Sequence, residues 1–281
     1  MTARHVRVAA SPDADDRFMV WALATGRLET PGFTWSFEHH PTDVLNTLGD
    51  REDLDVLALS MAAWPRLADR WRILPHGGSL GEGYGPVVVA TTPRDVASLS
   101  GRPVAIPGET TTAWSVLRML VEAVPVHTPI TPYELAFERL RSGEVDAALL
   151  IHEGRLTWEA EGFYAVVELG QAWRAIAGDL PLPLGINTLR ASLPASEQRA
   201  ISAHLRAAIA YGLSHREDAI TWLLDHGSSL RDAEQLRTYL DMYANARTLD
   251  YGEEGRAAVA FYLDRGAKTG LWPAIEADWA P

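Results

Sequence analysis

Cysteine is absent from the 281-residue sequence, and Lys268 is its one lysine. The first absence excludes disulfides, thiol nucleophiles, iron–sulfur clusters and cysteine zinc sites. The second leaves only one residue near the C-terminus for Schiff-base chemistry, which we therefore do not expect. Basic residues are also outnumbered, with 25 Lys+Arg against 37 Asp+Glu and a net charge of −12. We expect neither nucleic acid nor a membrane surface as partner, because both attract basic patches.

Long apolar runs are missing as well. No segment approaches the ~18 apolar residues that a membrane helix needs. The apolar stretch near the N-terminus is too short for the core of a signal peptide and leads into an acidic turn. It reads better as a first strand, so we expect a cytoplasmic protein.

Strand-like and helix-like segments alternate along the rest of the chain, which predicts an α/β fold with parallel-rich sheets flanked by helices. In the first part the predicted strands are 6–10, 33–38, 55–59 and 86–91, and the predicted helices are 15–25, 42–48 and 60–69. The pattern then restarts with strands 103–106, 145–151 and 164–169 and helices 111–124 and 133–141. From residue 195 onward helices dominate, at 195–214, 216–226, 232–246 and 253–266.

Two proline-containing segments, Thr92–Asp95 and Pro181–Gly185, bracket the middle block. We expect a smaller inserted α/β domain at 93–185 and a larger discontinuous domain made of 1–92 plus 186–281, with a helical C-terminal part. Two strands that cross between these lobes would form a hinge over a ligand cleft.

Four polar clusters follow predicted strands, where ligands bind in open parallel sheets. They are Ser11–Asp16, Ser60, Gly108–Thr112 and His152. Their expected convergence on one side predicts a small-molecule site. His152 is the leading candidate for a general base, because an apolar strand delivers its imidazole to a polar cleft edge.

Each cluster also has a purely structural interpretation. Ser60 is typical of a helix N-cap, and the threonines 110–112 could be a cap and surface. At least two of Asp13, Asp15 and Asp16 are interpreted as helix-start residues only. His152 could be a satisfied histidine at a strand end.

Several known motifs are incomplete. His152-Glu153 begins like a zincin helix but lacks the second histidine, and no metal site is predicted. The glycine-rich segment 77–85 leads into a strand instead of a helix, so it is interpreted as a flexible loop that could cover the cleft. A tryptophan that follows a cluster, such as Trp64, Trp114 or Trp158, could line a pocket for a flat ligand.

Taken together, the segments resemble one enzyme family, the 1,4-dihydroxy-6-naphthoate synthases of the futalosine route to menaquinone. The resemblance spans nearly the whole chain. It rests on segments that occur in the same order: Ser11-Pro12 with Asp16 and Phe18, Leu59-Ser60, Gly77-Gly78, Gly85-Pro86, Pro107-Gly108 with Thr111-Thr112, Ile151-His152-Glu153 with Arg155, Leu182-Pro183-Leu184-Gly185, and Asn245-Ala246 with Gly252–Gly255.

The resemblance implies a two-lobed fold of the periplasmic binding protein type II class with a ligand cleft between the lobes. It implies conversion of cyclic dehypoxanthinyl futalosine to 1,4-dihydroxy-6-naphthoate by a carbon–carbon lyase that uses neither a metal nor an organic cofactor. His152 would be the general base, and Ser60, Thr111 and Thr112 would bind polar groups of a substrate with a carboxylate and an aromatic ring. Ser11 and Asp16 would line the same cleft. A homodimer is possible.

The chain departs from the family pattern at two positions. Asp15 stands where the best-known members have asparagine, and Ala58 where some have lysine. An added anion and a lost cation change how the cleft treats an acidic substrate. Two other functions remain open: a non-catalytic solute-binding or sensor protein of the same fold, and a chorismate dehydratase-like enzyme.

Overall fold

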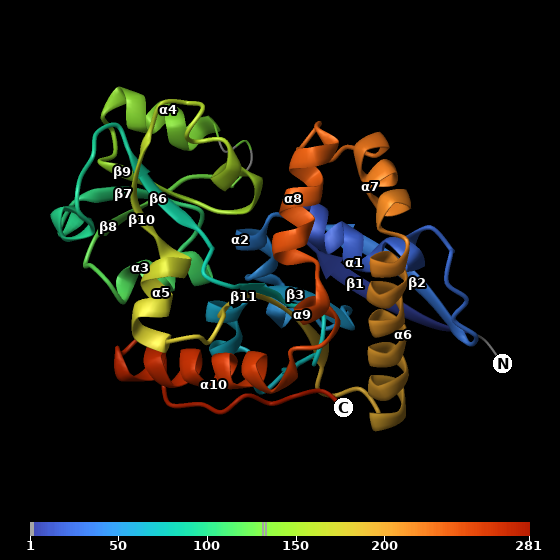
Figure 1. Ribbon diagram of the computed structural model, residues 1–281. Helices are drawn as coiled ribbons and strands as arrows, with labels where there is room; N and C mark the ends of the chain where they lie inside the picture. The colour runs from blue at the N-terminus through green and yellow to red at the C-terminus, as the bar shows by residue number, and fades with distance from the viewer. Residues whose placement is uncertain (1–2, 131, 133) are drawn as a thin grey trace.

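The computed structural model describes residues 3–130, 132 and 134–281. Their strands form two sheets, seen on the right and left of Figure 1. The first sheet has the order β2 (Phe33–His39), β1 (Arg4–Ala10), β3 (Val56–Ser60), β11 (Leu182–Arg190) and β4 (Trp71–Ile73), with β5 (Ser79–Gly81) also paired to β11. The second has the order β10 (Tyr164–Glu168), β6 (Val87–Ala90), β9 (Ala147–Leu150), β7 (Pro103–Ile106) and β8 (Val124–His127).

Both sheets are mixed. β1 runs parallel to β2 and β3, and β7 runs parallel to β8 and β9. The antiparallel pairs involve β11 in the first sheet and β6 in the second. The predicted α/β class is confirmed, with parallel pairing among β1, β2 and β3 and among β7, β8 and β9.

Helices cover both sheets (Figure 1). Around the first sheet lie α1 (Ala14–Ala24), α6 (Ala195–Ser214), α7 (Arg216–Asp225) and α8 (Ala233–Tyr243). The second carries α3 (Thr112–Arg118), α4 (Glu134–Ser142) and α5 (Leu169–Ala177). The remaining helical segments are α2 (Thr42–Leu45), α9 (Ala246–Leu249), α10 (Gly252–Lys268) and the 3₁₀ turns η1 (Leu48–Asp50), η2 (Met61–Arg66), η3 (Val96–Leu99) and η4 (His152–Leu156).

The spacing of apolar residues explains why α6 packs where it does. Ile201, Leu205 and Ile209 are buried at helical intervals, so one stripe of the helix faces α1. Gly212 continues this stripe, and a Cβ there would lie 3.2 Å from the ring of Phe18 on α1. The small residue thus allows close contact between the two helices, and α1 carries Asp15 and Asp16 of the site in its first turn.

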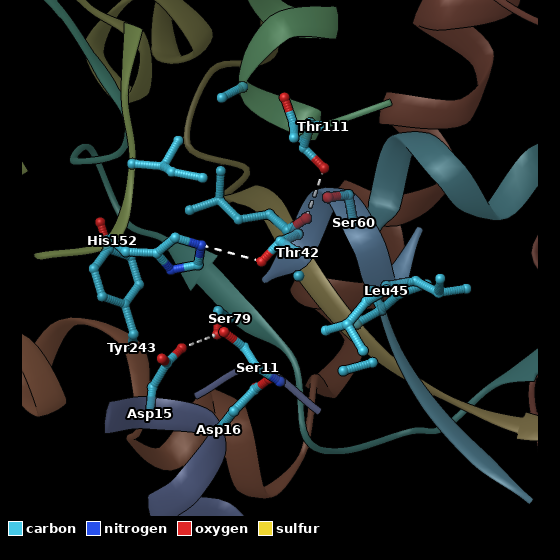
Figure 2. Close-up of a pocket in the computed structure, with 18 of the residues that line it drawn as sticks. Ser11, Asp15, Asp16, Thr42, Leu45, Ser60, Ser79, Thr111, His152 and Tyr243 are labelled. Carbon is cyan, nitrogen blue, oxygen red and sulfur yellow. Dashed lines mark hydrogen bonds between the residues drawn. The ribbon is translucent and has the colours of Figure 1, made fainter. Parts of the chain in front are cut away.

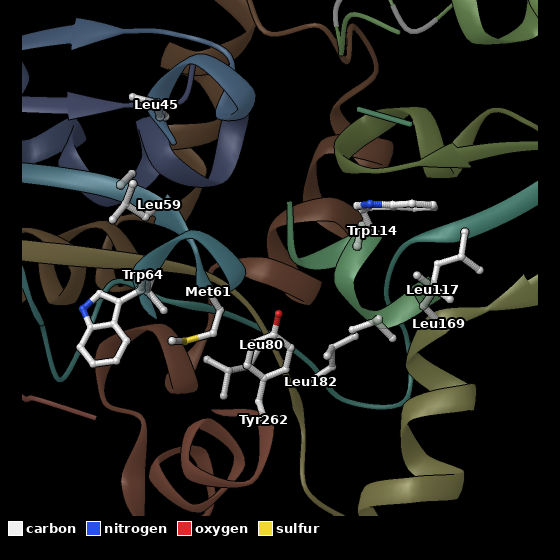
Figure 3. Close-up of a cluster of buried hydrophobic side chains, with 14 of the residues drawn as sticks. Leu45, Leu59, Met61, Trp64, Leu80, Trp114, Leu117, Leu169, Leu182 and Tyr262 are labelled. Carbon is white, nitrogen blue, oxygen red and sulfur yellow. The ribbon is translucent and has the colours of Figure 1, made fainter. Parts of the chain in front are cut away.

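One hydrophobic cluster reaches from the first sheet to the second (Figure 3). Leu59 and Met61 lie at one end and Trp114 and Leu117 at the other, with Tyr262 of α10 between them. The Tyr262 hydroxyl is 2.5 Å from Ser115 Oγ on α3. The floor beneath the space between the sheets is therefore a continuous packed core.

Several predicted elements differ from the structure. The segment after Ser60 is a 3₁₀ turn with Pro65 inside it, since proline removes a backbone donor and disfavours a longer α-helix. The helix predicted at 111–124 ends at Arg118, and its last predicted residue begins β8. Tyr133, predicted to begin a helix, lies outside the described residues, and α4 is described from Glu134.

The glycine-rich segment is not a cleft-covering loop. Its residues Ser79–Gly81 form β5, which is buried and paired to β11. The chain passes between the two sheets before β6 and again before β11. β6, at 87–90, already belongs to the second sheet, and β11 joins the first sheet from Leu182. Within the described residues, no helix combines the length and apolar character needed to cross a bilayer.

Candidate functional site

A cavity with about 760 Å³ of empty space, counted out to its open mouth, lies where the loops of the two sheets meet. All six predicted site residues line it: Ser11, Asp16, Ser60, Thr111, Thr112 and His152. The structure adds further lining residues, which are Asp15, Thr42, Leu45, Ala58, Leu59, Gly77, Ser79, Pro86, Ala113, Ile151, Leu184, Gly185, Ile186, Tyr239 and Tyr243. The convergence expected from strand order is therefore present.

His152 is held by two side chains from the first sheet's segments. Its Nδ1 lies 3.2 Å from Asp13 Oδ2, in the loop after β1. Its Nε2 lies 3.2 Å from the Thr42 hydroxyl on α2, the contact drawn in Figure 2. The imidazole side chain is 21% exposed, so it is neither packed in the core nor free in solvent. This position fits a group that exchanges protons with a ligand.

Carboxylates gather at one end of the cavity (Figure 2). The two oxygens of buried Asp15 accept hydrogen bonds from Ser79 Oγ at 2.8 Å and Tyr239 Oη at 3.1 Å. Asp16 Oδ2 accepts from the backbone N–H of Ser11 at 2.6 Å. The Ser11 hydroxyl donates to Asp13. Asp13 makes no side-chain cap bond to its helix.

Burial sets the protonation of these acids. It raises the pKa of Asp15 despite the nearby imidazole and the two hydroxyl donors. Burial and the charge of Asp15 raise the pKa of Asp16 to about 8. Burial and the charge of Asp13 raise the pKa of Glu153 to about 7. Part of this cluster therefore holds protons at neutral pH.

The same cluster also raises the pKa of His152. Burial lowers its pKa, but the carboxylates of Asp13, Asp15, Glu153 and Asp16 outweigh that effect and raise the pKa above the ordinary 6.5. The protonated imidazole is thus favoured to a higher pH than in water. A proton taken up by this ring has a stabilising negative environment.

The other end of the cavity is built from uncharged groups. Ser60 Oγ accepts a hydrogen bond from Asn46 Nδ2 at 3.1 Å, and the Ser60 N–H donates to Asn46 Oδ1 at 2.9 Å. Among the described residues, none accepts the hydroxyl proton of Ser60, so this hydroxyl can donate to a ligand oxygen. Ser60 occupies the N-cap position of η2, but its side chain makes no cap bond there.

The hydroxyls of the two threonines are already engaged. Thr111 Oγ1 accepts from Trp114 N and donates to Gly108 O at 2.8 Å, so Thr111 is the N-cap of α3. Thr112 Oγ1 donates to Leu184 O at 2.6 Å and accepts from Ala62 N at 3.3 Å. Both line the cavity, but their hydroxyl protons are bound within the protein. Ser60 is better placed than either to donate a hydrogen bond.

The sequence interpretation missed several site residues. Asp13 and Asp15 are not simple helix-start residues, because Asp15 lines the cavity and Asp13 contacts His152. The aromatic lining residues are Tyr239 and Tyr243, not the tryptophans. Their four-residue spacing on α8 could have indicated one shared face.

Asn46 and Thr42 carry no comparable signal in the sequence. Both departures from the family pattern, Asp15 and Ala58, lie in the cavity wall. The lining thus contains no arginine or lysine. In the described parts of the chain, no group of three or more His, Asp or Glu is arranged to hold a metal ion.

Known structures share this architecture. The alkanesulfonate-binding protein SsuA of Xanthomonas axonopodis pv. citri, solved with MOPS, has a TM-score of 0.70 at 14% identity. The match covers 99% of this chain and 97% of that one. The fold defines an α/β protein of the periplasmic binding protein type, with a cavity between its two sheets.

Nearer relatives define the family. Residues 6–268 match the family model described as menaquinone biosynthesis. The 1,4-dihydroxy-6-naphthoate synthase of Streptomyces coelicolor is 35% identical over 99% of this chain and 98% of its own, and that of Thermus thermophilus is 37% identical over 95% of each. A crystal structure from Archaeoglobus fulgidus has a TM-score of 0.86 at 34% identity, covering 95% of this chain and 98% of that one. The chain belongs to the menaquinone-biosynthesis family.

Proposed function

We propose that this protein is a 1,4-dihydroxy-6-naphthoate synthase, a carbon–carbon lyase that acts on cyclic dehypoxanthinyl futalosine. The observation that carries the proposal is the His152 imidazole in the wall of a cavity shared by both sheets, in a chain similar over its full length to enzymes of that name. A solute-binding protein of this fold needs no such partly buried base.

His152 acts as the general base that removes a proton beside a carbonyl group of the substrate. Nε2 of the ring accepts the proton, and the surrounding carboxylates stabilise the imidazolium. Ser60 donates its hydroxyl proton in a hydrogen bond to the oxygen on which negative charge develops. Asn46 holds that serine through two hydrogen bonds.

The two ends of the cavity suit the two parts of the substrate. The end with Ser60, Thr111 and Thr112 has no anionic side chain, so it accepts the carboxylate-bearing aromatic portion with less repulsion. The acidic end, with Asp15 and Asp16, accepts hydrogen bonds from hydroxyl groups of the sugar-derived portion. Ser11 holds Asp16 and Asp13 in place there.

The two sheets would belong to two domains, a larger discontinuous one and a smaller inserted one, with the chain crossing between them just before β6 and β11. The cytoplasmic location and the homodimer stay predictions from the sequence.

Incubation of the purified protein with cyclic dehypoxanthinyl futalosine tests the proposal. We expect release of 1,4-dihydroxy-6-naphthoate, detected by mass and absorbance. His152→Ala should lower kcat by ~10²-fold or more, as loss of a general base does. Ser60→Ala should lower kcat by roughly 10-fold or more through the lost oxyanion donor.

Matched controls separate chemistry from folding. His215→Ala removes an imidazole from the exposed end of α6, and it should leave turnover unchanged. Recovery of the substrate unchanged after prolonged incubation with the wild-type protein would contradict the synthase assignment. Full activity of His152→Ala would contradict the base assignment alone.

A further inference from the structure

The two ring nitrogens of His152 contact groups that come from the opposite side of the cavity. His152 follows β9 of the second sheet. Asp13, at 3.2 Å from Nδ1, lies in the loop after β1, and Thr42, at 3.2 Å from Nε2, begins α2. The imidazole is therefore oriented by the first sheet's segments, although its backbone belongs to the second.

The backbone at this residue is also unusual. His152 has φ 49°, and it is the one non-glycine residue with positive φ among the described residues. Such a conformation is strained for a residue with a side chain and persists where surrounding contacts fix it. The contacts of the ring with Asp13 and Thr42 fix this backbone conformation, in which the imidazole points across the cavity.

Asp13 is built to act on the ring rather than on its own helix. Its carboxylate makes no side-chain cap bond to α1. The Ser11 hydroxyl donates to the same Oδ2 that faces His152 Nδ1, and this fixes the carboxylate in place. An ionised carboxylate can only accept, so the neutral imidazole must carry its proton on Nδ1. Nε2 then keeps a lone pair on the side of the Thr42 hydroxyl.

We propose that Asp13 is the positioning residue of His152, which fixes the Nδ1–H tautomer so that Nε2 is the atom that accepts the substrate proton. This inference rests on the proposed function of His152 as general base. The pairing spans the cavity, so the base is fully assembled only while the loops of both sheets are together. Thr42 holds the place beside Nε2 where the acidic C–H group of a substrate would lie.

Other charged groups around the ring do not substitute for Asp13. Asp15 and Asp16 lie on α1, Glu153 follows His152 directly, and Tyr239 reaches in from α8. Each of the three acids interacts with the imidazole through charge, but only Asp13 is within ion-pair distance of a ring nitrogen. Removal of Asp13 thus leaves an acidic environment but takes away the group that selects the tautomer.

Histidine side-chain NMR on the full-length ¹⁵N-labelled protein tests this without any substrate. The signals of His152 are assigned by their loss in His152→Gln. We expect the wild-type ring, once neutral, to be in the Nδ1–H form. In Asp13→Asn we expect a shift towards the Nε2–H form and a His152 titration about one pH unit or more lower, because an adjacent negative charge is gone.

Turnover provides the second readout. Asp13→Asn should lower kcat at least about 10-fold and move the acid limb of the kcat/KM profile to lower pH, which a merely structural role would not do. Asp13→Glu keeps the charge and should recover part of kcat. The control Asp179→Asn removes an equal charge from a side chain that is 97% exposed, and neither profile nor tautomer should change.

The outcomes separate the two proposals. A wild-type His152 in the Nε2–H form, or an unchanged tautomer and titration in Asp13→Asn, overturns the positioning role even if the enzyme is active. If Asp13→Asn does not fold, the wild-type tautomer still decides. A wild-type protein that leaves cyclic dehypoxanthinyl futalosine intact contradicts the proposed function, and the NMR result still stands on its own.

Discussion

Replacing Asn46 should affect both the stability of the fold and the function of the cavity. This side chain is fully buried beside α2. Its Nδ2 donates to Ser60 Oγ at 3.1 Å and to the Thr110 backbone oxygen at 3.2 Å, and its Oδ1 accepts from Ser60 N at 2.9 Å. One amide therefore ties the end of β3 to the loop before α3, which belong to different sheets.

Asn46→Ala removes all these bonds and leaves at least two polar groups, the Ser60 N–H and the Thr110 carbonyl, without their partner. Each orphaned buried group costs about 1–3 kcal/mol. The free energy of unfolding should therefore fall by about 2–6 kcal/mol. For a chain of this size, that corresponds to a drop in Tm of roughly 3–10 °C.

Thermal unfolding followed by circular dichroism measures this loss, and the naphthoate assay measures kcat in the same preparations. Asn46→Asp keeps the acceptor for Ser60 N–H but faces the Thr110 carbonyl with a second acceptor, so it should also be destabilising. The exposed neighbour Thr47 provides the control, because Thr47→Ala loses only a surface hydrogen bond to Val44. A Tm for Asn46→Ala equal to that of Thr47→Ala would refute the reasoning.

Two further predictions concern stability. Burial raises the pKa of Asp16 from 3.8 to about 8 and that of Glu153 from 4.5 to about 7, so the folded state binds these protons more tightly than the unfolded chain. Their contribution to stability is fully present below the ordinary pKa values and is lost as the pH rises through 7 and 8. Tm should therefore fall between pH 5 and 9, and it should fall less steeply in Asp16→Asn. Equal slopes would show that Asp16 does not titrate in this range. In α5, a Cβ on Gly170 would lie 2.3 Å from the Tyr84 backbone carbon. Gly170→Ala should therefore lower the free energy of unfolding by about 1–3 kcal/mol in denaturant titrations. The control Gln171→Ala, at an exposed position, should change it by less than about 0.5 kcal/mol.

The long, strongly patterned elements were predictable from local sequence. The buried run Val56–Ser60 and the strand Arg4–Ala10 show the expected apolar pattern, and α6 and α8 follow helical spacing. The strands β5, β8 and β11 were not predicted. They contain glycine or proline, and these residues resemble loop sequence unless a neighbouring strand supplies hydrogen bonds.

The sequence by itself determined which side chains reach the cavity from strand ends, because parallel strands place their carboxyl ends at one edge. It therefore indicated Ser11, Ser60 and His152 correctly as lining residues. Only the tertiary structure decided which partner each one meets. Asp13 and Asn46 act through contacts across 139 and 14 residues of chain, respectively, and no local pattern encodes a hydrogen bond between segments that the fold alone brings together.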